Sequence, residues 1–109
     1  MQKLITFLFI LLPCTAYSSA ESSGLPDVDM TPVNVSEHVW YVKGKAGTAT
    51  ENAGFVSNAG FVITGDGVVI FDGLGTPVLA SMMLKEIRKL TQEPIRKVVV
   101  SHYHADHVY

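Results

Sequence analysis

The sequence contains very little cysteine. Cys14 is the only cysteine among 109 residues, so the chain beyond it has no disulfide and no thiolate to offer a metal. Basic side chains are also few, 8 Lys and Arg against 10 Asp and Glu, and they form no run that would indicate a nucleic-acid partner. Charged residues make up 17% and hydrophobic residues 48%, which excludes wholesale disorder and is typical of one small globular domain.

The only long apolar run lies at the N-terminus. Leu4–Leu12 (LITFLFILL) follows Lys3 and has about the length of a signal-peptide core, which is too short for an ordinary membrane span. Small residues at 18–20 (SSA) fit a cleavage point. We therefore predict a secretory signal over residues 1–20 and a periplasmic or secreted mature protein with no stable membrane association. An uncleaved anchor or a lipid on Cys14 are the alternatives.

The first half of the remaining chain has the pattern of strands. Residues 21–34 are polar, with two prolines and a glycine, and are interpreted as a linker. Residues 35–42 and 54–64 are rich in β-branched and aromatic side chains and predict two strands. The polar stretch 43–52 between them is predicted to be a mobile loop, which either covers a site or is an idle connection.

A third strand and a helix follow. Val68–Phe71 comes after a Gly-Asp-Gly turn, and its continuous apolar run predicts a strand buried on both faces. Thr76 and Pro77 are typical of a helix N-cap and first helical residue. The apolar residues that recur at helical spacing are Val78, Leu79, Met82, Met83, Ile87 and Leu90. A strand is then predicted over residues 95–100, so the order indicates an α/β (α+β) fold with a mixed sheet and a flanking helix.

The segment after that last strand reads Ser-His-Tyr-His-Ala-Asp-His and holds three of the four histidines. The side chains His102, His104, Asp106 and His107 are of the types that zinc and similar divalent metals bind. In an extended segment His102, His104 and Asp106 would alternate onto one face, with His107 following, so the ligands could divide between two neighbouring metals. Tyr103 would point to the opposite face, into packing. The alternative is a polar loop with chance histidines.

These residues resemble a known family. Residues 98–107 (VVVSHYHADH), together with 58–64 (NAGFVIT) and 67–73 (GVVIFDG), are similar to the metallo-β-lactamase superfamily. The resemblance covers residues 35–109 and implies the N-terminal half of an αββα sandwich. It implies that His102 and His104 bind a first metal and that Asp106 and His107 bind a second.

The resemblance also implies further roles. Asp106 would help a proton reach the leaving group, and Asp72 would support the site from behind. The implied cofactor is Zn²⁺, two ions per full-length domain, with iron or manganese as alternatives. The remaining ligands of the family come from a C-terminal half that this sequence does not contain, so we expect a fragment with little or no activity alone.

The expected activity is that of an exported zinc-dependent hydrolase acting on a small-molecule ester, thioester, lactone or β-lactam, with no nucleic-acid partner. An iron-dependent, persulfide dioxygenase-like redox enzyme of the same fold and a noncatalytic metal-binding module are the alternatives. His38, the one histidine outside the cluster, is expected to be structural or on the surface. Trp40 and Tyr41 are expected to lie in the core.

Overall fold

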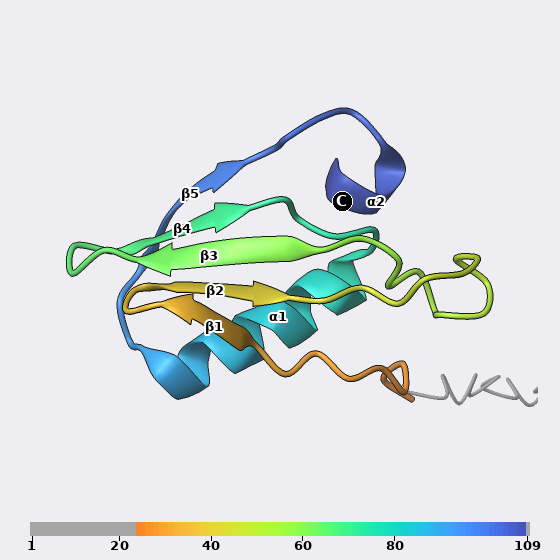
Figure 1. Cartoon of the computed structure of the whole chain (residues 1–109), viewed down its shortest axis with the longest axis horizontal. Helices are drawn as coiled ribbons and strands as arrows, with labels where there is room; N and C mark the ends of the chain where they lie inside the picture. Colours follow the sequence, from red (N-terminus) through yellow and green to blue (C-terminus); the bar gives the residue numbers. More distant parts are fainter. Residues whose placement is uncertain (1–23, 109) are drawn as a thin grey trace, which may run out of the picture.

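The computed structural model describes residues 24–108, so the predicted signal over residues 1–20, including Cys14, lies outside the described part. Seven elements are β1 (Val33–Ser36), β2 (Val39–Val42), β3 (Ala59–Ile63), β4 (Val68–Phe71), α1 (Pro77–Leu90), β5 (Ile95–Val99) and α2 (Ala105–Val108). The strands form one sheet in the order β1-β2-β3-β4-β5, antiparallel as far as β4 and parallel between β4 and β5 (Figure 1). The predicted mixed sheet with a flanking helix is confirmed.

The prediction of one strand over residues 35–42 is wrong. The chain instead turns at Glu37 and His38, and β1 pairs antiparallel with β2, with Ser36 opposite Val39. Both turn residues are exposed, and β1 is an exposed edge strand. The strand-forming residues were recognised, but two exposed polar residues between them make a hairpin rather than one continuous strand.

The strand predicted over residues 54–64 is shorter than expected, because β3 begins only at Ala59. The residues before it close the base of the preceding loop. Lys45 N–H donates to the Phe55 carbonyl at 2.9 Å, and Gly44 N–H donates to Asn58 Oδ1 at 2.9 Å. The hydrogen bonds of these residues therefore go to the loop and not to a neighbouring strand.

Helix α1 begins as the sequence predicts. Thr76 Oγ1 accepts the Leu79 N–H at 3.2 Å, and Pro77 occupies the first turn. The buried side chains are Leu79, Met83 and Ile87, at helical spacing. Val78 and Leu90, expected on the packed face, are exposed. No helix within residues 24–108 has the length and apolar character needed to cross a bilayer.

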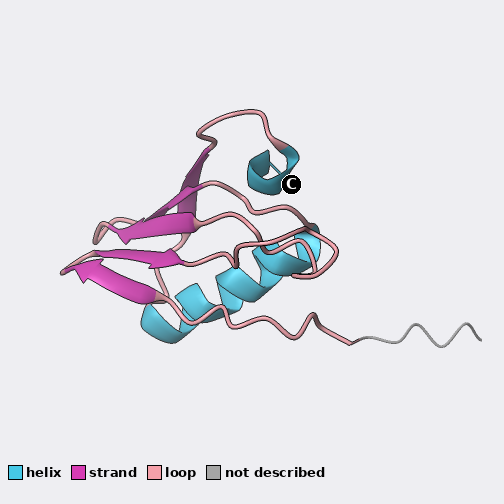
Figure 2. Cartoon of the chain, turned by 45° about the vertical axis from the view of Figure 1, so that its right-hand side comes forward, coloured by secondary structure: helices cyan, strands magenta, loops and turns pink. Residues whose placement is uncertain are grey.

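The core lies between α1 and one face of the sheet (Figure 2). Val42, Phe61, Val68 and Ile70 are buried there. Trp40 is half-buried and stacks on Phe61 with ring centroids 5.7 Å apart, so it packs against the core as expected.

The opposite face of the sheet is more open, and the expectation that β4 is buried on both faces is wrong. Phe71 is 45% exposed, although Ile70 beside it is buried on the α1 side. Val99 pairs alongside Phe71 and is also exposed. Successive residues of a strand point to opposite faces of the sheet. Among the described elements, α1 covers only one of these two faces (Figures 1 and 2).

Candidate metal centre

The site forms where the two parallel strands end. Phe71 pairs with Val99, and the next residue, Asp72, donates its N–H to the Val99 carbonyl at 2.8 Å. Because the carboxyl ends of parallel strands meet at one edge of a sheet, Asp72 lies beside Ser101. Ser101 N–H donates to Asp72 Oδ1 at 2.7 Å. The topology thus joins two segments that lie about thirty positions apart in the sequence.

Asp72 has an unusual backbone conformation. Its φ of +66° lies in the left-handed region, which is uncommon for a residue other than glycine. The residue is only 8% exposed. The next residue, Gly73, donates its N–H to the His107 carbonyl at 2.8 Å. The turn after β4 therefore aims both the Asp72 side chain and the Gly73 amide at the histidine-rich segment.

The Asp72 carboxylate sets the tautomer of His107 directly and that of His102 through Ser101. Its Oδ2 accepts from His107 Nδ1 at 2.9 Å and from Ser101 Oγ at 2.8 Å. Since Ser101 gives its only hydroxyl proton to this carboxylate, its oxygen accepts from His102 Nδ1, which lies 2.9 Å away. The hydrogen-bond network therefore places a proton on Nδ1 of each ring, so in the neutral tautomer Nε2 is the nitrogen of His102 and of His107 that could bind a metal.

The same contacts decide the charge of Asp72. Burial by itself would raise the pKa of the carboxyl group. The Ser101 N–H, the His107 ring and the Ser101 hydroxyl all stabilise the anion, and together they bring the pKa below its ordinary value of 3.8. Asp72 is therefore an anion near neutral pH and acts as an acceptor only.

The structure brings the four predicted ligands together. His102 Nε2 lies 2.9 Å from His104 Nδ1, and the His102 and His107 ring centroids are 4.2 Å apart. His107 Nε2 lies 3.3 Å from Asp106 Oδ2. Close contacts thus join His102 with His104 and Asp106 with His107, the two pairs that the family resemblance implies as ligands.

The backbone that produces this arrangement is not the expected extended one. The chain bends at His102 and Tyr103, and Asp106 and His107 lie in the short helix α2 (Figure 1). His107 N–H donates to the His104 carbonyl at 3.0 Å and closes the turn. Alternation along a strand is therefore the wrong reason for the spacing. Tyr103, expected to pack, is instead 86% exposed.

Residues 52–109 match the family model of the metallo-beta-lactamase superfamily, which is more than half of the chain. The chain belongs to the metallo-beta-lactamase superfamily. The matched range contains Asp72 and the whole histidine-rich segment, and it begins within the loop that follows β2. Members of the superfamily generally bind metal ions and are largely hydrolytic.

The donors of this superfamily member fit a divalent metal in kind. Imidazole nitrogens with a fixed tautomer and an adjacent carboxylate are the ligands that zinc takes. Within residues 24–108, no three His, Asp or Glu side chains are arranged to hold one ion. The described residues therefore supply donors in pairs, whereas a catalytic zinc usually has three protein ligands.

Two serines that the sequence did not single out belong to the site. Ser101 links Asp72 to His102, and its position directly before the cluster could have indicated this role. Ser57 is 6% exposed, and its hydroxyl donates to the Asp106 carbonyl. No sequence signal could have found Ser57, because the contact spans 49 positions and depends on the fold.

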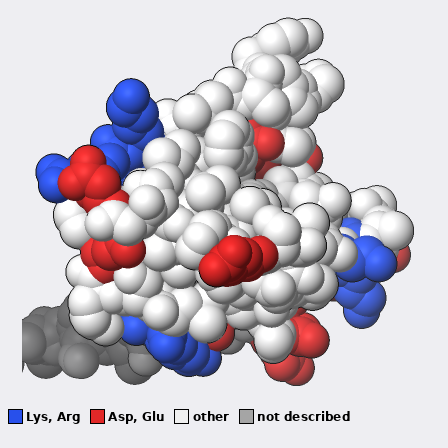
Figure 3. Space-filling view, turned by 60° about the vertical axis from the view of Figure 1, so that its left-hand side comes forward, with Lys and Arg blue, Asp and Glu red and all other residues white. Residues whose placement is uncertain are grey.

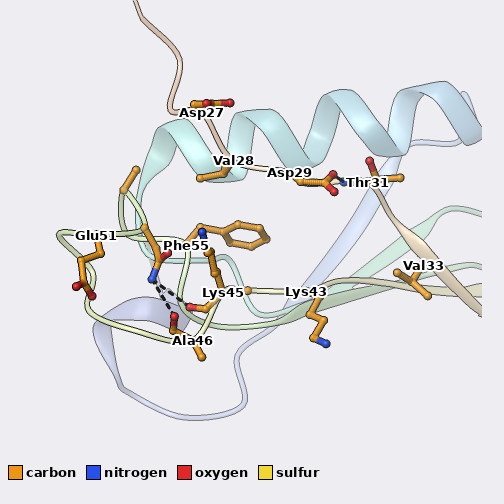
Figure 4. Close-up of a pocket in the computed structure, with 13 residues that line it drawn as sticks. Asp27, Val28, Asp29, Thr31, Val33, Lys43, Lys45, Ala46, Glu51 and Phe55 are labelled. Atoms are coloured by element: carbon orange, nitrogen blue, oxygen red, sulfur yellow. Dashed lines mark hydrogen bonds between the residues drawn. The ribbon is translucent and has the colours of Figure 1, made fainter.

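A large cavity lies apart from the histidines. It has a volume of about 740 Å³ and separates Asp27, Val28 and Asp29 from the loop that carries Lys45 and Glu51 (Figure 4). None of the predicted ligands lines it. His107 instead lines an apolar cavity of about 380 Å³ between α1 and β5. His38 is exposed on the β1–β2 turn, as expected.

Proposed function

We propose that the chain carries the metal-binding segment of an exported zinc-dependent metallo-hydrolase that cleaves an ester, thioester, lactone or β-lactam bond of a small molecule. One observation carries the proposal. The Asp72 network places a proton on Nδ1 of His107 and, through Ser101, on Nδ1 of His102, so that Nε2 is the nitrogen each ring would offer to a metal. A buried carboxylate that sets two imidazole tautomers is typical of the support behind a metal site.

The donor pairs suggest how two metals would be held. His102 Nε2 and His104 Nδ1 share one proton in a hydrogen bond of 2.9 Å and would bind the first ion once that proton is released. Asp106 and His107 present a carboxylate oxygen and a ring nitrogen at 3.3 Å and would bind the second. A zinc ion bound there supplies Lewis acidity, which lowers the pKa of water to about neutrality and polarises a carbonyl group.

The chain's own residues would orient the reaction and move a proton. Asp72 holds the His107 ring, whose side chain is only 18% exposed, in one orientation. The Asp106 carboxylate is more open and can accept a proton and return it to the leaving group. The fixed rings and the accessible carboxylate thus support roles of metal ligand for His102, His104 and His107 and of ligand and proton carrier for Asp106.

The proposed substrate and compartment rest on composition. Lys and Arg lie in separate groups near the edges of the face shown in Figure 3, interspersed with Asp and Glu. The formal net charge of −2 and this mixed surface favour a small molecule over a nucleic acid. The apolar run and small residues within 1–20 support export to the periplasm or medium.

The proposal is tested by hydrolysis assays on the full-length protein with and without zinc. The panel contains one ester, one thioester, one lactone and one β-lactam. We expect zinc-dependent cleavage of at least one, reduced by about 100-fold or more in kcat by Asp106→Asn. His38→Ala, which changes the exposed histidine outside the cluster, is the control and should retain activity. A zinc-loaded protein that cleaves none of the four would contradict the proposed function.

A further inference from the structure

We propose that Ser57 is a positioning residue for the ligand pair Asp106 and His107. The part of this inference that concerns metal affinity rests on the proposed function. Ser57 lies at the base of the loop between β2 and β3, far from the ligands in the sequence. Its side chain is buried, and its hydroxyl donates to the Asp106 main-chain carbonyl.

The main chain of the ligand pair is held at two consecutive carbonyls. Ser57 Oγ bonds the Asp106 carbonyl, and Gly73 N–H bonds the His107 carbonyl at 2.8 Å. The second contact comes from the backbone and survives any substitution that keeps the fold. The first comes from a side chain, so a substitution of Ser57 can remove it while the Gly73 contact stays.

Ser57 is itself held firmly in place. Gly44 passes so close that a Cβ built on it would lie 2.7 Å from the Ser57 nitrogen. On either side of this contact, Lys45 N–H bonds the Phe55 carbonyl and Gly44 N–H bonds Asn58 Oδ1, each at 2.9 Å. The loop base therefore provides a rigid anchor for the Ser57 hydroxyl.

A second glycine supports Asp106 by close packing. A Cβ built on Gly75 would lie 3.2 Å from Asp106 Cα and 3.3 Å from the Gly54 carbonyl oxygen. Backbone packing at Gly75 and the Ser57 hydrogen bond thus both fix Asp106. Packing limits how closely the segment can approach, whereas the hydrogen bond also resists its moving away.

The consequence is different for the two donor pairs. Removing the hydroxyl frees the Asp106 carbonyl and loosens the first turn of α2, which carries Asp106 and His107. His102 and His104 precede α2 and make no hydrogen bond to Ser57. Loss of Ser57 should therefore weaken the second metal position more than the first.

Native-state hydrogen exchange of the metal-free chain tests the positioning role. The two informative amides are Gly73, whose N–H bonds the His107 carbonyl, and His107, whose N–H bonds the His104 carbonyl and closes the turn that carries Asp106. In Ser57→Ala they should exchange about threefold to tenfold faster, the effect of one lost hydrogen bond. Amides in the middle of α1 should not change, which shows that the fold is kept. Ser81→Ala, an exposed serine of α1, is the matched control. Equal exchange of Gly73 and His107 in the two variants would overturn the inference.

A zinc titration of the same three proteins tests the consequence for the metal. In Ser57→Ala the affinity of the second zinc should fall by about tenfold, with the first changed less. Equal losses at both positions would contradict selective positioning of Asp106 and His107. If no protein, including the unsubstituted chain, binds zinc, the proposed function fails, and hydrogen exchange still decides the role of Ser57.

Discussion

Asp72 Oδ2 lies 2.9 Å from His107 Nδ1, although the two residues are 35 positions apart. The contact exists because β4 and β5 run parallel and end at the same edge of the sheet. Asp72 follows the first strand, and the histidine-rich segment follows the second. The carboxylate also accepts from the Ser101 amide and hydroxyl. It therefore connects the end of the sheet to the donors before any metal is bound.

Replacing Asp72 by Ala should destabilise the metal-free protein. The substitution leaves the Ser101 N–H and the His107 Nδ1–H without their acceptor at a partly buried place. We expect a loss of about 1–3 kcal/mol in the free energy of unfolding, measured by urea denaturation. Asp66→Ala, at an exposed turn, is the control and should change the value by less than about 0.5 kcal/mol. Equal stabilities of the two variants would show that the carboxylate does not organise this edge.

The same group predicts a pH dependence of stability. The pKa of Asp72 is lowered by folding, so its contribution to stability is fully present above the ordinary value of 3.8 and is lost as the pH falls through the lower folded value. The difference in unfolding free energy between the unsubstituted chain and Asp72→Asn should shrink as the pH falls from about 5 to about 3. Urea denaturation at several pH values measures it. A difference that stays constant or grows on acidification would be inconsistent with a stabilised anion.

The close approach of Gly44 to Ser57 predicts a steric requirement for glycine. A Cβ at position 44 would lie 2.7 Å from backbone atoms of Ser57, so the loop base must shift. Gly44→Ala should cost about 1–3 kcal/mol in unfolding free energy. In the control Gly60→Ala the new methyl carbon would meet only the Trp40 carbonyl oxygen, at 3.5 Å. If thermal or urea unfolding finds the two variants equally stable, the loop base is not packed as described.

The sequence was most informative where local chemistry decides the structure. Thr76 and Pro77 predicted the start of α1, and the spacing of Leu79, Met83 and Ile87 predicted its buried face. The types and spacing of His102 and its neighbouring donors predicted the cluster. In each case the interacting groups lie within a few residues of one another, so a short pattern contains the relevant physics.

Features that depend on distant contacts were predicted poorly. Ser57 shows no local signal, because its partner Asp106 approaches only when the sheet has formed. The exposure of Phe71 depends on what covers the second face of the sheet, which an apolar run cannot reveal. The helical turn that carries Asp106 replaced the expected strand alternation, and the same donors were still brought together. The closeness of these side chains was therefore easier to predict than the backbone conformation that produces it.

The central claim is that the segment from His102 to His107 binds divalent metal in two donor pairs supported by Asp72. Its most direct test is titration of the purified chain with zinc, measured by calorimetry, and with cobalt, measured by visible absorption. We predict that the unsubstituted chain binds two ions. The double substitution His102→Ala and His104→Ala should abolish binding of the first ion. The double substitution Asp106→Ala and His107→Ala should abolish binding of the second. His38→Ala should bind as the unsubstituted chain does. A chain that binds neither ion, or that binds equally well without these donors, would contradict the claim.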